Sequence, residues 1–110
     1  MSDCEFCKII EGKVPGKKLF ESKNVIAIND INPSADTHIL VIPKKHIETV
    51  ADVKEGDEKL VFEMIKTSQK LIREKKLAKG YKLIFNGGKY QFVPHLHLHL
   101  LGGNMKKEAI

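Results

Sequence analysis

The chain has no long apolar run, no tryptophan and only two cysteines among its 110 residues. No segment approaches the roughly 20 apolar residues of a membrane-spanning helix, so we expect no contact with a membrane. Two cysteines are too few for the disulfide framework of a small secreted domain. The N-terminus also lacks the basic and then apolar regions of a signal peptide, which makes a cytoplasmic location the default expectation.

The positive charge is not gathered into one stripe. The chain carries 19 Lys and Arg against 14 Asp and Glu, a net charge of +5, and only 6% of its residues are aromatic. Its lysine pairs are dispersed, with few aromatic residues between them, whereas a nucleic-acid-binding surface typically shows a stronger basic stripe. We expect solvated lysines with a mild attraction for phosphates, and no nucleic-acid partner.

The length and composition fit one globular domain over residues 1–110. A chain of this size buries roughly 65% of its unfolded surface, so a core without disulfides is feasible. Hydrophobic residues make up 42% and charged residues 30% of the chain, which is typical of soluble domains. Since no repeat, linker or low-complexity segment interrupts the sequence, a single domain is expected.

Hydrophobic periodicity predicts two helices and five strands. A short helix is expected over residues 4–10 and a long amphipathic helix over 55–77, with Gly80 as its C-terminal cap. The segments with strand character are 18–21, 25–29, 38–42, 81–85 and 93–101, the last ended by Gly102 and Gly103. Five strands around one amphipathic helix predict an α+β fold with a largely antiparallel sheet.

Residues 95–101 read His-Leu-His-Leu-His-Leu-Leu. In a strand, His95, His97 and His99 would lie on one face and the leucines on the other. Imidazole can be a base, nucleophile or metal ligand near neutral pH, although the row could also be the solvated face of a half-buried strand. A neutral histidine can form a covalent intermediate. Without a Ser/His/Asp order or paired carboxylates, the row favours attack on phosphorus.

The two cysteines form a Cys4-Glu-Phe-Cys7 pair. In a cytosolic chain this spacing indicates a pair of metal ligands or a redox-active pair. Tetrahedral zinc would need two further ligands, for which His46 and His95 are candidates, and four protein ligands would make the site structural. Two free thiols packed as small hydrophobic groups are the alternative, and composition alone leaves both open.

Three segments resemble one known family. They are Cys4-Glu-Phe-Cys-Lys-Ile-Ile-Glu-Gly-Lys-Val-Pro, the block from Asp30 to His46, and the segment from Gln91 to Gly103. Together they resemble the histidine triad (HIT) family, with its His-φ-His-φ-His-φ-φ signature, and are most similar to its HINT-like branch of purine nucleoside phosphoramidase-like proteins. The resemblance implies a HIT-like fold, which has a five-stranded sheet, one long helix and a short helix at the N-terminus. It also implies a homodimer.

The resemblance also implies a role for each histidine. His97 would attack the α-phosphate of a purine nucleotide conjugate and form a nucleotidyl-histidine, while His99 and His38 would bind the phosphate and orient the nucleophile. Zn²⁺ would be held by Cys4, Cys7, His46 and His95. The nucleotide contacts would be Asp30 on the ribose, Ile9, Val14, Ile28 and Ile31 around the base, and Asn86 and Gln91 at the phosphate or leaving group; for Ile28 and Ile31, a place in the core is the alternative.

The implied activity is hydrolysis of nucleoside phosphoramidates. The alternatives are a dinucleoside polyphosphate hydrolase and a zinc-stabilised nucleotide-binding protein with little catalysis. The chain departs from the HINT-like pattern at Tyr90 and Phe92, which stand where a glycine and a serine are usual, in a loop about two residues shorter. Tyr90 keeps its backbone N–H, but Phe92 has no hydroxyl to assist the leaving group.

Overall fold

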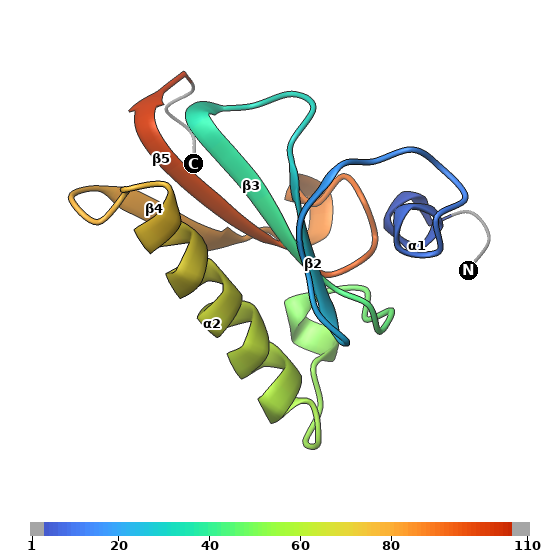
Figure 1. The fold of residues 1–110 in the computed structure, drawn as a ribbon. Coiled ribbons are helices and arrows are strands. Elements are labelled where there is room, and N and C mark those ends of the chain that lie inside the picture. The colour runs from blue at the N-terminus through green and yellow to red at the C-terminus, as the bar shows by residue number, and fades with distance from the viewer. Residues whose placement is uncertain (1–3, 107–110) are drawn as a thin grey trace.

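The computed structural model describes residues 4–106 and shows a five-stranded antiparallel sheet in the order β1-β2-β3-β5-β4 (Figure 1). The helices are α1 (Glu5–Ile10) and α2 (Glu58–Glu74), with two short 3₁₀ helices, η1 (Val50–Asp52) and η2 (Gly88–Tyr90). The strands are β1 (Lys18–Glu21), β2 (Val25–Asn29), β3 (Ala35–Pro43), β4 (Tyr81–Phe85) and β5 (Leu98–Met105). The predicted α+β class is confirmed.

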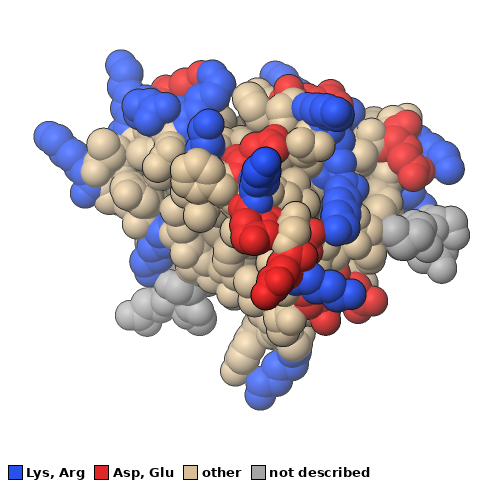
Figure 2. All heavy atoms as spheres, turned by 90° about the horizontal axis from the view of Figure 1, so that it is seen from below, with Lys and Arg blue, Asp and Glu red and all other residues tan. Residues whose placement is uncertain are grey.

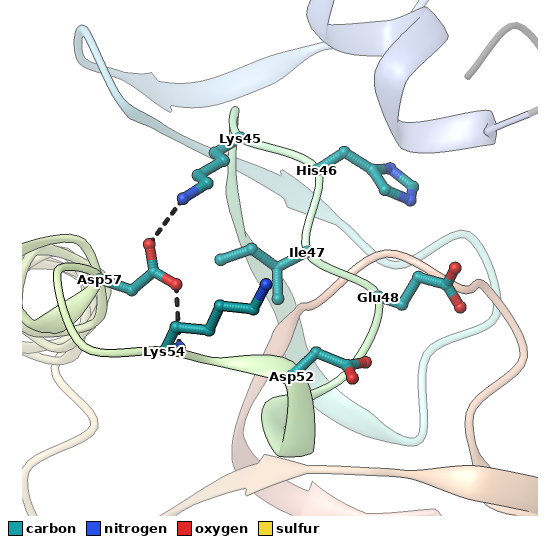
Figure 3. Close-up of a pocket in the computed structure, with 7 residues that line it drawn as sticks. All are labelled: Lys45, His46, Ile47, Glu48, Asp52, Lys54 and Asp57. Atoms are coloured by element: carbon teal, nitrogen blue, oxygen red, sulfur yellow. Dashed lines mark hydrogen bonds and ion pairs between the residues drawn. The ribbon is translucent and has the colours of Figure 1, made fainter.

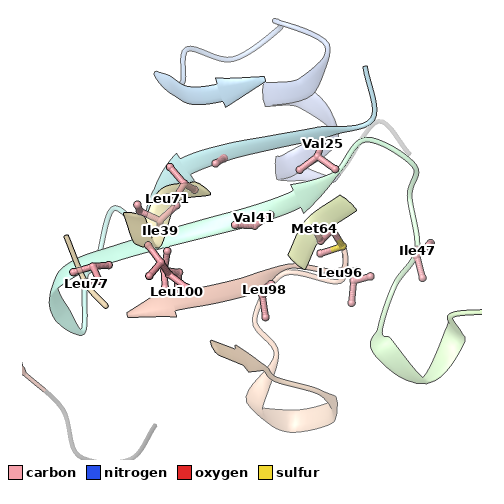
Figure 4. Close-up of a cluster of buried hydrophobic side chains, with 12 residues drawn as sticks. Val25, Ile39, Val41, Ile47, Met64, Leu71, Leu77, Leu96, Leu98 and Leu100 are labelled. Carbon is pink, nitrogen blue, oxygen red and sulfur yellow. The ribbon is translucent and has the colours of Figure 1, made fainter. Parts of the chain in front are cut away.

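Both faces of the sheet are covered, each by a different part of the chain. In β3, Ile39 and Val41 join the cluster that includes Met64 and Leu71 of α2 (Figure 4), whereas Leu40 packs in the cluster that includes Phe6 of α1. Successive strand residues point to opposite faces, so α2 and α1 lie on opposite sides of the sheet (Figure 1). The sheet thus separates a core on the α2 side from a second layer on the α1 side.

Helix α2 is three residues shorter at each end than the predicted span of 55–77. Gly56 has a φ of +96° and the Asp57 carboxylate accepts the Lys54 backbone N–H at 3.0 Å, so a turn occupies the segment before Glu58. At the other end Lys76 adopts a left-handed φ of 57°, which stops the helix before Gly80. The prediction of Gly80 as the cap was therefore wrong.

Strand β5 also differs from its predicted span of 93–101. It begins at Leu98 because Pro94, which lacks an N–H, lies in an irregular segment that ends at 97. It runs on through the glycine pair to Met105, which pairs with Ala35, so β3 also begins three residues before His38. Gly103, with a φ of +78°, sits at a register shift rather than at the strand end.

The charged surface agrees with the dispersed lysines of the sequence. Figure 2 shows lysine and arginine side chains scattered over one face and interleaved with carboxylates. Neither helix in the described part of the chain combines the length and apolar character needed to cross a bilayer.

Candidate active site

The histidines gather on the α1 side of the sheet. His99 of β5 pairs with Leu40 of β3, and His38 lies two residues before Leu40, so both imidazoles share one face. His97 and His95 precede β5, but the intervening Leu96 still packs in the α2-side core. The alternation predicted for the histidine row therefore holds although its first half is not strand. All four imidazoles are less than 10% exposed.

A backbone N–H sets the tautomer of His38, and His38 in turn sets that of His99. The Ser34 N–H donates to His38 Nδ1 at 2.9 Å, so a neutral His38 carries its proton on Nε2. That nitrogen lies 2.8 Å from His99 Nδ1 and 3.4 Å from an Asp30 carboxylate oxygen. When His38 Nε2–H donates to His99 Nδ1, the proton of a neutral His99 is left on Nε2. His99 then offers an N–H donor to the cavity.

His97 has the opposite tautomer. Its Nδ1–H donates to the His95 carbonyl at 2.7 Å, which leaves a lone pair on Nε2. Burial lowers the His97 pKa below its usual value, while the Asp30 charge raises it. The edge of the Phe6 ring packs against the imidazole at 5.0 Å between centroids. His97 is therefore a held, neutral imidazole with a free nitrogen, as a nucleophile requires.

The imidazoles of His38, His97 and His99 line a cavity of about 510 Å³. Five of the predicted nucleotide contacts line it as well: Ile9, Ile28, Asp30, Ile31 and Asn86. Sequence reasoning missed Glu5, Phe6, Asn29, Asn32, Ser34, Leu40 and Val93, which carry no motif of their own, while Tyr90 and Phe92 also line the cavity. The Asn86 amide nitrogen lies 3.4 Å from His99 Nε2.

Two predicted contacts are not among the lining residues. Val14 is 40% exposed in the loop after α1. Gln91 donates its amide Nε2–H groups to the backbone carbonyls of Glu48 (2.6 Å) and Val93 (2.9 Å). The Gln91 side chain thus ties the loop before β5 to the segment after β3.

A second group of side chains meets beside the cavity. Cys4, Cys7, His46 and His95 place their ligand atoms within 4.8 Å of one another. His95 Nδ1 lies 3.3 Å from Cys4 Sγ, 3.6 Å from Cys7 Sγ and 3.1 Å from His46 Nδ1. Zn–N bonds of about 2.0–2.1 Å and Zn–S bonds of about 2.3 Å give tetrahedral ligand separations of about 3.3–3.8 Å. The cluster is compatible with zinc.

The chemistry of this cluster also suits a metal. The His95 Nε2–H donates to the Pro43 carbonyl at 2.7 Å, so Nδ1 carries the lone pair that faces the other ligands. Burial lowers the His95 pKa and so favours the neutral ring. In the absence of a metal, burial and the neighbouring Cys4 raise the pKa of the Cys7 thiol to about 11. A cation would offset that effect by stabilising the thiolate.

A second hollow, of about 440 Å³, has His46 in its lining (Figure 3). Two of its charged groups pair with each other, Lys45 with Asp57 at 2.7 Å, and Asp57 also accepts the Lys54 backbone N–H. It contains none of the triad imidazoles. The cavity with His97 is the better candidate active site.

Comparisons with known proteins agree with this geometry. Residues 3–109 match the family described as "Scavenger mRNA decapping enzyme C-term binding". An uncharacterized HIT-like protein of Chlamydia muridarum is 44% identical over 91% of this chain and 81% of its own length. The structure of a HIT family hydrolase from Legionella pneumophila Philadelphia 1 superposes with a TM-score of 0.91 at 44% identity, covering 97% of this chain and 98% of that one.

A HIT family hydrolase from Clostridium thermocellum gives a TM-score of 0.92 at 42% identity, covering 100% of this chain and 98% of that one. The match therefore extends over the whole fold as well as over the histidine motif. This chain belongs to the histidine triad (HIT) family.

Proposed function

We propose that this protein hydrolyses purine nucleoside phosphoramidates at the α-phosphate through a nucleotidyl-histidine. The observation that carries the proposal is the state of His97, whose Nδ1–H is held by the His95 carbonyl and whose Nε2 lone pair is free. Because His97 lines a cavity together with His38 and His99, a phosphate could meet a nucleophile and hydrogen-bond donors at one place. The hydrolases among its structural relatives support the same class of reaction.

In the first step the His97 Nε2 lone pair forms a bond to phosphorus and the P–N bond breaks. The electron pair of that bond leaves with the amine, which takes a proton from water. The His97 ring becomes positively charged, and its Nδ1–H bond to the His95 carbonyl stabilises this charge. The nearby Asp30 charge acts in the same direction.

In the second step water attacks phosphorus and the phosphorus–Nε2 bond breaks. Its electron pair returns to His97, and the proton of the attacking water passes to solvent. The overall reaction consumes one water and gives a nucleoside monophosphate and a protonated amine. The His99 Nε2–H would donate to a phosphate oxygen in both steps, and His38 would hold His99 in that tautomer.

The nucleoside would be held on the β2 side of the cavity. The Asp30 carboxylate is a suitable acceptor for ribose hydroxyls, and its carboxylate also accepts the Asn32 N–H at 2.8 Å, which fixes its orientation. Ile9, Ile28 and Ile31 would flank the base. Of these, Ile31 is 92% exposed, which favours a contact with ligand over the core alternative.

We further propose that Cys4, Cys7, His46 and His95 hold a structural Zn²⁺. Four protein ligands leave no open position for water or substrate, so the metal would stabilise the fold and would take no part in the reaction. A cytoplasmic location, which the sequence favours, and a homodimer, which the family resemblance implies, complete the proposal.

The activity is tested with adenosine 5′-phosphoramidate and a coupled assay for AMP. His97→Ala is expected to lower kcat by at least about 1000-fold, while AMP still binds in isothermal titration. Mass spectrometry of native protein quenched rapidly in alkali, in which a phosphorus–nitrogen bond to histidine survives, should locate the nucleotidyl group on the peptide that contains His97. Val50→Ala, at an exposed position outside the cavity, is the control.

Two results would contradict this assignment. Unchanged turnover in His97→Ala would remove His97 as the nucleophile. Binding of AMP by the native protein without turnover of any conjugate would instead favour a nucleotide-binding protein.

A further inference from the structure

The order of the strands gives the cavity two sides. Ile28 and Asp30 lie at the end of β2, while Asn86 and the loop through Tyr90 and Phe92 follow β4. Since the order is β2-β3-β5-β4, the histidine strand β5 stands between the two groups. A nucleoside bound beside Asp30 therefore leaves the β4 side, with Tyr90 and Phe92, for the leaving group.

The cavity is poor in positive charge. None of the described residues that line it is a lysine or an arginine, and two of them, Glu5 and Asp30, are carboxylates. The chain as a whole has a net charge of +5, so this local absence is not a matter of composition. A polyphosphate leaving group would bring several negative charges that such a lining does not neutralise. The lining favours a leaving group without phosphates.

Two aromatic rings lie exposed on the leaving-group side. Lys89 Nζ lies 5.3 Å from the centroid of the Tyr90 ring and covers one of its faces, whereas no such cation contact involves Phe92 among the described residues. Phe92 is 92% exposed and Tyr90 is 65% exposed. The backbone that carries them is tied down, because the Tyr90 N–H donates to the Gly87 carbonyl and the Gln91 N–H to the Gly88 carbonyl. The Gln91 side chain adds its bonds to Glu48 and Val93. Rings on an anchored loop offer contact area at a low cost in conformational entropy.

We propose that Tyr90 and Phe92 form a stacking surface for a planar aromatic group on the leaving amine. This inference rests on the proposed function and names its substrate class: nucleoside 5′-phosphoramidates in which a single phosphate joins the nucleoside to an amine that carries an aromatic ring. The bond changes are those given above, with the ring-bearing amine as the group that leaves and takes a proton from water.

The test compares adenosine 5′-phosphoramidates of benzylamine and cyclohexylmethylamine, which differ in planarity at similar size. The ratio of their kcat/KM values is measured for the native protein, Phe92→Leu and Tyr90→Leu. Comparing this ratio between variants cancels the intrinsic difference between the amines. We expect it to fall by about 3- to 10-fold in Phe92→Leu. Val50→Ala, at an exposed position outside the cavity, should keep the native ratio.

The ratio of the two dissociation constants is measured in proteins that also carry His97→Gly, because these do not cleave the conjugates. A lower preference for the benzyl conjugate in Phe92→Leu, both in turnover and in dissociation constant, would establish the stacking surface. An unchanged ratio in both measurements would overturn it while leaving the proposed function intact.

Two further measurements test whether a polyphosphate or a second copy of the chain, instead of an aromatic group, contacts Tyr90 and Phe92. Diadenosine triphosphate should have a kcat/KM at least about 10-fold below that of the benzyl conjugate, and a higher value would overturn the assignment of the leaving group. Light scattering of Phe92→Leu should give the native mass; dissociation of the protein would show that a second copy covers the ring. Absence of turnover with every conjugate would reject the proposed function, and unchanged binding ratios would then reject the stacking surface separately.

Discussion

Four buried imidazoles on one side of the sheet differ because of what holds their second nitrogen. The Pro43 carbonyl accepts from His95 Nε2, so Nδ1 faces the cysteines. The His95 carbonyl accepts from His97 Nδ1, so Nε2 is free. A backbone group decides which nitrogen of His38, His95 and His97 is available for chemistry, and the His38 ring decides it for His99.

The buried His99 should make stability depend on pH. Burial and the neighbouring His97 and His38 lower the His99 pKa from 6.5 to about 4, against the opposing effect of Asp30. Between pH 4 and 6.5 the unfolded chain then binds more protons than the folded chain, so stability rises with pH in this window. We expect the free energy of unfolding in urea to be lower at pH 5 than at pH 7.

His99→Gln should show a smaller difference between the two pH values, because the group that titrates is removed. Tyr90→Leu changes the same cavity but leaves every histidine in place, so it should keep the native difference. If the difference in unfolding free energy between pH 5 and pH 7 is equal or larger in His99→Gln than in the native protein, groups other than His99 cause the loss of stability in acid.

Among the elements, β5 depends on its glycine pair for packing. An added Cβ at Gly102 would lie 2.5 Å from a methyl carbon of Leu77 and 3.0 Å from its Cγ. Leu77 is buried in the α2-side core, which limits its room to move. The segment after α2 can approach β5 closely only because residue 102 has no side chain.

Gly102→Ala should therefore destabilise the protein by about 1–3 kcal/mol through overpacking. Urea denaturation followed by circular dichroism measures this change. Gly80→Ala is the matched control, since a Cβ there meets nothing within 4 Å. If both variants unfold at the same urea concentration, the close approach of Leu77 carries no energetic cost.

On the scale of the whole molecule, the cysteine and histidine cluster joins three distant segments. Cys4 and Cys7 belong to the start of the chain, His46 follows β3, and His95 lies just before β5. A zinc ion at this point would fasten α1 to the sheet and hold the backbone next to His97.

Cys4→Ser should lose zinc and unfold at a lower temperature than the native protein, because metal binding free energy contributes to folding. Elemental analysis of purified protein and thermal denaturation with and without a chelator provide the measurements. His38→Asn, a change to a histidine outside the cluster, should keep its zinc. Full occupancy in Cys4→Ser would reject this ligand set.

We also expect two copies to associate. Strand β4 is an edge of the sheet and exposes Tyr81 and Leu83, and α2 exposes Phe62 and Ile65. Exposed apolar edges of this kind favour pairing. Light scattering should give twice the chain mass of 12.4 kDa, and Leu83→Lys should shift the protein toward the monomer. A native mass of one chain would contradict this expectation.

The sequence by itself determined the fold class, three strand spans and the chemical content of the site. The segments 18–21, 25–29 and 81–85 are strands with the predicted bounds, because local β-propensity and turn residues act over a few positions. The histidine row, the cysteine pair and the family resemblance together pointed to the seven cysteines and histidines, which the structure brings together in two neighbouring groups.

The ends of β5 and α2 were decided by tertiary contacts. Whether Gly102 and Gly103 end a strand or continue it depends on the pairing of Met105 with Ala35, a contact across 70 residues. Likewise, the sequence could not show that Gln91 binds backbone carbonyls or that Phe92 stands exposed beside the histidines. Periodicity records which face a residue takes, but proton positions, cavity walls and strand ends arise only when distant segments meet.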